Sequence, residues 1–166
     1  MNKKGKAMDI SLFCGIFCAV VFFTVMNVFG NPYDLIHKVD SHNIVPPVWL
    51  WRTTMTVWGF LIGYAAGRVI NTVSCGGASV HDKISAYRGG LFFISAFFLS
   101  LSHYPVFFCA ERLFVALIVA LSAAALSVFC GISWAKAYRM SSIIMLGFSF
   151  WLFYVIFVNA GVLLRV

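Results

Sequence analysis

Five long apolar runs dominate this sequence, and each is about as long as a helix that crosses a bilayer. A helix rises 1.5 Å per residue, so roughly 20 residues span the ~30 Å hydrocarbon core. The runs lack the in–out alternation of membrane-barrel strands. Only 10% of the residues are charged, too few to cover a water-exposed surface. We therefore predict an all-α integral membrane protein, one domain over residues 1–166, with transmembrane helices at roughly 9–29, 47–70, 87–107, 110–133 and 140–164.

The lysines and arginines predict how the chain is oriented. With the N-terminus inside, eight of the 12 basic residues face the cytoplasm and four face outside, as the positive-inside rule requires. Segment 30–46 is then an external loop and segment 71–86 an internal one. The basic residues are scattered singly, without the stripe that binds phosphate backbones, so nucleic acid is not an expected partner.

Constellations typical of catalysis or metal binding are missing. No paired carboxylates or nucleophile motif accompany the histidines. Cys14 and Cys18 share one helical face, but no histidine or carboxylate nearby completes a metal site. An odd number of cysteines in apolar segments does not indicate a disulfide framework. We expect no covalently bound cofactor. The histidines, all expected in or near loops, are His37, His42, His81 and His103.

The start of the second segment is rich in prolines, tryptophans and threonines. Pro46 and Pro47 suit the first turn of a helix, where the missing N–H groups have no intrahelical partner. Trp49 and Trp51 fit either an aromatic belt at the membrane interface or the mouth of a cavity. The threonines that follow fit two interpretations equally well: they line a cavity mouth, or they donate hydrogen bonds to the backbone of their own helix.

Small and polar residues predict contacts between helices. Gly59, Gly63 and Gly67 recur at intervals of four, so they form a groove that permits close helix approach. Asn159, a polar amide in the fifth segment, should bond across to another helix. Trp151 lies near the middle of the same segment. Because a buried indole N–H needs a partner, Trp151 should face the bundle interior or a cavity.

These features together resemble the TspO/MBR family, which comprises the tryptophan-rich sensory proteins and the translocator protein (peripheral benzodiazepine receptor). The family's second-helix pattern, PPxWxF then T then GxA, is similar to Pro46-Pro47-Val48-Trp49-Leu50-Trp51, Thr56 and Gly63-Tyr64-Ala65. Its fifth-helix pattern resembles Arg139, Ser141, Ser142, Phe148, Trp151 and Asn159, and its third-helix aromatic pair and following glutamate resemble Phe97-Phe98 and Glu111. The chain departs from the family at Pro32-Tyr33, Met55, Gly90, Phe93 and Gly147.

The resemblance implies a five-helix bundle in a bacterial cytoplasmic membrane, often a homodimer, with a cavity beneath the first external loop. The implied ligand is planar and hydrophobic: a porphyrin, haem or a sterol. Some bacterial members are reported to degrade porphyrins in light by means of cavity tryptophans, which are replaced here, so enzymatic activity is not expected. The implied ligand-binding residues are Tyr33, Pro47, Trp49, Trp51, Met55, Phe93, Phe97, Trp151 and Val155.

A different class of function is also open: a small transporter, or a structural subunit whose aromatic residues only pack. Transport coupled to protons or ions usually depends on charges within the membrane. The predicted helices carry none near their centres, which disfavours that mechanism. A packing-only subunit remains the alternative to a ligand-binding protein.

The orientation can be tested by labelling single cysteines in a chain whose native cysteines are replaced. A cysteine at Ser41 should react with a membrane-impermeant maleimide in intact cells, because 30–46 is expected outside. A cysteine at Lys83 should react only after permeabilisation. The opposite pattern would reverse the orientation.

Overall fold

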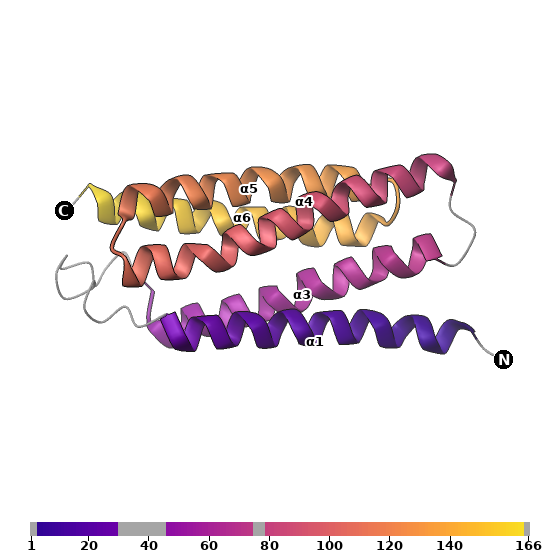
Figure 1. Cartoon of the computed structure of the whole chain (residues 1–166), viewed down its shortest axis with the longest axis horizontal. Helices are drawn as coiled ribbons and strands as arrows, with labels where there is room; N and C mark the ends of the chain where they lie inside the picture. The colour runs from indigo at the N-terminus through magenta and orange to yellow at the C-terminus, as the bar shows by residue number, and fades with distance from the viewer. Residues whose placement is uncertain (1–2, 30–45, 75–78, 165–166) are drawn as a thin grey trace.

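The computed structural model describes residues 3–29, 46–74 and 79–164, and every regular element in these ranges is helical. The elements occur in the order α1 (Lys3–Phe29), α3 (Val48–Ser74), α4 (Val80–Tyr104), the π-helical turn η1 (Pro105–Cys109), α5 (Leu113–Trp134) and α6 (Arg139–Leu163) (Figure 1). The all-α class and the count of five long helices are confirmed for the described residues.

Four of the five long helices are apolar enough to cross a membrane by length and composition. These spans are Ile10–Phe29, Val80–Cys109, Leu113–Trp134 and Arg139–Leu163. Helix α3 has 27 residues, which is long enough, but it does not reach the same hydropathy. Arginines at both ends and a series of threonines and glycines lower its average. The prediction of five transmembrane helices is therefore confirmed for four of them.

The helices form two groups (Figure 1). Helix α1 packs along α3, whereas α4 packs on α5 and α5 on α6. Helices α3 and α6 join the groups: Ser141 Oγ donates a hydrogen bond to the carbonyl oxygen of Ala65 (2.8 Å). Contacts of α4 with α3 and α1 are sparser. The start of α1 and the end of α6 lie at opposite ends of the bundle, as an odd number of crossings requires.

The glycine groove of α3 holds the backbone of α1. A Cβ atom on Gly63 would collide with the carbonyl oxygen of Cys14, and one on Gly67 would lie 2.6 Å from Ser11 Cα. A Cβ on Gly59 would lie 2.7 Å from the Phe22 ring. Glycine therefore lets the two helices approach more closely than any larger residue would allow.

Helix α4 begins at Val80 rather than at 87, so the bounds expected for the loop at 71–86 are wrong. Ser79 and Asp82 form a capping box: the Asp82 N–H donates to Ser79 Oγ and the Ser79 N–H to Asp82 Oδ2, each at 3.2 Å. Helix α3 also continues to Ser74. Apolar runs mark only the part of a helix within hydrocarbon, and these helices extend beyond it by polar turns.

The connection between α4 and α5 also differs from the expected one. Helix α4 passes into a π-helical turn at Pro105, whose carbonyl oxygen accepts a hydrogen bond from the Ala110 N–H (2.9 Å). The chain then turns at Glu111, where φ is 49°, an uncommon value for a residue other than glycine. Helix α5 therefore starts at Leu113 rather than at 110.

Gly63→Ala should destabilise the protein by about 1–3 kcal/mol, because the added methyl group meets backbone rather than a flexible side chain. Gly90→Ala is the matched control, since its Cβ would meet nothing within 4 Å. Removing a helical glycine there should be neutral or stabilise slightly. Thermal unfolding in detergent measures both. Equal stability of the two variants would contradict the tight α1–α3 contact.

Candidate functional site

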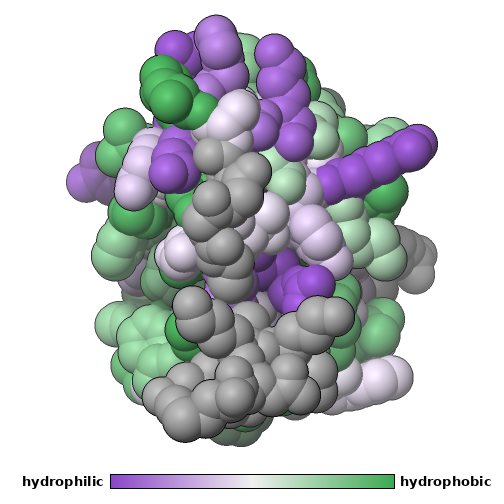
Figure 2. Space-filling model, turned by 90° about the vertical axis from the view of Figure 1, so that its right-hand side faces the viewer, coloured by the Kyte–Doolittle hydropathy of each residue, from purple (hydrophilic) through white to green (hydrophobic). Residues whose placement is uncertain are grey.

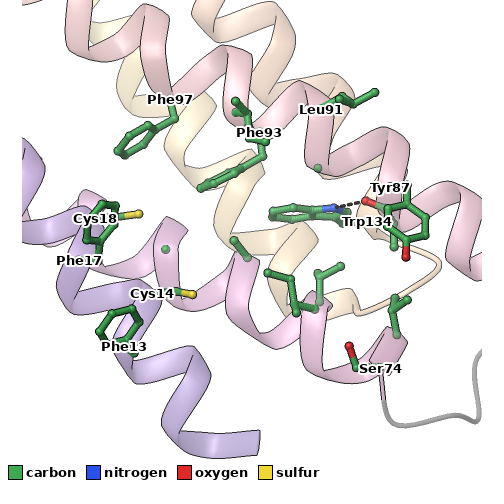
Figure 3. Close-up of a pocket in the computed structure, with 18 of the residues that line it drawn as sticks. Phe13, Cys14, Phe17, Cys18, Ser74, Tyr87, Leu91, Phe93, Phe97 and Trp134 are labelled. Atoms are coloured by element: carbon green, nitrogen blue, oxygen red, sulfur yellow. Dashed lines mark hydrogen bonds between the residues drawn. The ribbon is translucent and has the colours of Figure 1, made fainter.

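An apolar cavity of about 680 Å³ lies between α1 and α3 on one side and α4 on the other (Figure 3). Ligand pockets in proteins typically measure about 300–1,000 Å³. Helix α1 contributes Phe13, Cys14, Phe17 and Cys18, α3 contributes residues from Gly63 to Ser74, and α4 contributes residues from Ala86 to Phe98. Trp134, at the end of α5, completes the lining.

Three aromatic rings form a stacked wall along the cavity (Figure 3). The Phe93 ring stacks on Trp134 with centroids 5.5 Å apart and on Phe97 with centroids 6.0 Å apart. Their planes are inclined by only 30° and 27° respectively. Such a row of nearly parallel rings offers an extended apolar face, which complements a planar ligand.

Trp134 is held in place by both its polar and its apolar atoms. Its indole N–H donates to the carbonyl oxygen of Ala86 (3.3 Å). The indole lies directly on Gly89, where a Cβ atom would collide with the ring. The indole is therefore oriented by α4 before any ligand arrives, and its one donor is already used. Trp134 can offer a ligand its ring face but not its N–H group.

The cavity opens sideways between α1 and α4. Four large apolar side chains of its lining are exposed on the outside of the bundle: Phe13 (71%), Phe17 (57%), Leu91 (69%) and Phe98 (63%). The space beside Gly90 is open, since a Cβ atom on this glycine would meet no other atom within 4 Å. In a bilayer, exposed apolar side chains of this kind face lipid tails. The cavity is therefore accessible from the hydrocarbon region.

Phe93 and Phe97 are the two predicted ligand-binding residues that line this cavity. The cavity uses the first half of α1, the second half of α3 and the first half of α4. The resemblance implies a cavity beneath segment 30–46, most of which lies outside the described residues, so that cavity stays a prediction. Tyr33 belongs to that segment and lies outside the described residues.

Four other predicted residues pack against one another rather than around the cavity. Trp51 is 4% exposed, and its ring centroid lies 5.8 Å from that of Trp151. The Trp151 indole N–H donates to Met55 Sδ (2.7 Å), so its partner is a side chain of α3. Val155 is also buried. These residues form a filled part of the core near the start of α3.

Pro47 and Trp49 are both exposed at the start of α3, and 68% of Trp49 is accessible. That exposure favours the interpretation of Trp49 as an interfacial tryptophan. Thr53 and Thr56 donate hydrogen bonds to the carbonyl oxygens four residues before them, at 2.8 and 2.9 Å. Of the two interpretations left open for these threonines, bonding to their own helix is the one observed.

Asn159 in α6 bonds across to α4, where its Nδ2 lies 2.7 Å from His103 Nε2. Both side chains are buried, and the His103 ring stacks on Phe107. The expected position of His103 in or near a loop is wrong, because α4 extends to Tyr104. The pair lies apart from the cavity lining.

We did not predict from the sequence that one site contains Trp134, Gly89 and the open space at Gly90. A tryptophan at the end of an apolar segment is typical of the membrane interface, so Trp134 carried no distinct signal. The Gly89-Gly90 pair inside an apolar run was the available clue, since glycine in a helix often marks a close approach. Among the described residues, no group of three histidine, cysteine or acidic side chains could hold a metal ion.

The fold and the cavity define a class: a helical integral membrane protein with an apolar cavity that opens towards the bilayer. The sequence model of the TspO/MBR family matches residues 11–165, which is nearly the whole chain. The protein therefore belongs to the TspO/MBR family, and the resemblance seen in its sequence is confirmed. No curated protein and no solved structure matches the chain significantly.

Asn159→Leu should destabilise the protein by about 1–3 kcal/mol, because it leaves the buried His103 imidazole without its partner. His103→Leu combined with Asn159→Leu should recover part of that loss, since both polar groups are then removed together. A double-mutant cycle of thermal unfolding measures the coupling. Strictly additive effects would contradict a direct interaction.

Proposed function

We propose that this protein binds a flat hydrophobic ligand of the porphyrin, haem or sterol class and holds it within the membrane as a receptor or carrier. The observation that carries the proposal is the stacked wall of Phe93, Phe97 and Trp134 beside an apolar cavity of about 680 Å³. Family membership supports a protein of this general kind.

The chemistry of the lining suits such a ligand. Burial of apolar surface contributes about 25 cal/mol per Å², so a large ring system gains affinity mainly by covering the aromatic wall. A ligand of this class partitions into hydrocarbon, and the sideways opening at Phe17 and Leu91 lets it arrive from there. Neither feature requires an external loop as the route of entry.

The N-inside orientation, itself a proposal, would place this cavity in the cytoplasmic half of the membrane. The cavity lies at the end of the bundle that holds the start of α1 and the connection between α3 and α4. A ligand could then exchange between the inner leaflet and the protein. The alternative function, a structural subunit, predicts that the cavity holds only lipid tails.

Tryptophan fluorescence can locate the ligand. Protoporphyrin IX added to the purified protein in lipid nanodiscs should quench the emission saturably. Because Trp134 lines the cavity and Trp151 does not, Trp134→Phe should remove most of the saturable quenching. Trp151→Phe, the matched control, should leave most of it.

Two outcomes would contradict the proposal in different ways. Quenching that survives Trp134→Phe but disappears in Trp151→Phe would move the site to the core near the start of α3, as the resemblance implied. No saturable quenching by protoporphyrin IX or by a fluorescent sterol would favour the structural subunit.

A further inference from the structure

The polar groups of the cavity lining gather at one end. Most of the wall is apolar, and its two hydroxyl groups belong to Ser74, the last residue of α3, and Tyr87, near the start of α4. Figure 3 shows both side chains at the end of the cavity beyond Trp134, away from Phe97. The cavity therefore has an apolar inner part and a polar rim.

Lys83 lies on the same face of α4 as two residues of the cavity lining. It precedes Ala86 by three residues and Tyr87 by four on α4, and residues at these spacings share one helical face. Its side chain is half-buried. Where the structure describes side chains, the Lys83 ammonium group makes no hydrogen bond or ion pair. The carboxylate of the neighbouring Asp82 accepts a hydrogen bond from the Ser79 hydroxyl group (2.7 Å).

The end of the bundle around this rim is strongly basic. Figure 2 looks onto it and shows hydrophilic side chains gathered there, with hydrophobic ones on the flanks. The described side chains at this end include one acidic residue, Asp82, against five basic ones. The basic residues are Arg68, Lys83, Arg88, Lys136 and Arg139. An anionic group at the rim would therefore meet a favourable electrostatic field.

We infer that the cavity is built for an acidic amphiphile, whose flat apolar body lies on the Phe93–Trp134 wall and whose carboxylate reaches Lys83. This inference rests on the proposed function and narrows it. A tetrapyrrole with propionate groups has the required acid at one edge, whereas a neutral sterol does not. A long lysine side chain can keep its stem on apolar surface while its ammonium group meets the acid at the membrane boundary.

A pair of probes with one ring system tests the inference. Protoporphyrin IX carries two propionates, and its dimethyl ester is the same ring without charge. In nanodiscs of zwitterionic lipid, the free acid should bind about two- to fivefold more tightly than the ester, the range expected for one solvent-accessible ion pair. Lys83→Gln should abolish this preference, because it should weaken binding of the free acid and leave binding of the ester unchanged. Lys136→Gln, a matched loss of charge in the turn between α5 and α6 rather than on the cavity-facing side of α4, should retain the preference.

Equal affinity of the unsubstituted protein for acid and ester would overturn the inference while leaving the proposed function intact. So would an equal loss of preference in Lys83→Gln and Lys136→Gln, because the effect would then come from net charge. Failure of both probes to bind would instead reject the proposed function itself.

A third arm identifies the source of the acidic group, since an anionic phospholipid presents similar chemistry. Nanodiscs that contain phosphatidylglycerol should weaken binding of the free acid if a lipid headgroup also occupies the rim, and Lys83→Gln should remove that competition. If phosphatidylglycerol does not weaken binding of the free acid, the rim binds the free ligand rather than a lipid headgroup. Competition that persists in Lys83→Gln would contradict the role of this lysine.

Discussion

The contact between the α1 backbone and the glycine face of α3 is the constraint on which the rest of the bundle depends. In lipid, helices gain little from the hydrophobic effect, so close van der Waals packing has to hold them together. Gly59, Gly63 and Gly67 provide that closeness. With α1 drawn tightly onto α3, neither helix covers much of α4, whose main partner is α5. The cavity is the space that this uneven packing leaves.

A second glycine contact shapes the opposite wall. Gly89 lets the Trp134 indole lie flat on α4, where the indole N–H bonds to Ala86 and the ring extends the row begun by Phe97 and Phe93. One residue further along, Gly90 leaves its surroundings open. Two adjacent glycines thus have different roles: the first positions an aromatic ring and the second keeps the volume beside it free.

Much of the architecture was predictable from the sequence because helix length and groove formation are local properties. Apolar runs located the five helices, and the spacing of Gly59, Gly63 and Gly67 located a groove. The start of α4 at Val80 was missed, since a capping box acts outside the apolar run. The cavity between α1, α3 and α4 was not predicted, for a different reason. Its position depends on which surfaces of α1, α3 and α4 fail to meet, and no single segment encodes that.

The central claim is that the space beside Gly90 is where the ligand binds. Gly90→Phe would direct a ring into that space, since a Cβ atom on this glycine would meet no other atom within 4 Å. The most direct measurement is the affinity of this variant for protoporphyrin IX, alongside its thermal unfolding. We expect an affinity loss of at least about tenfold, or roughly 1.4 kcal/mol, with an unchanged Tm. Undiminished affinity in a stably folded Gly90→Phe protein would contradict the account.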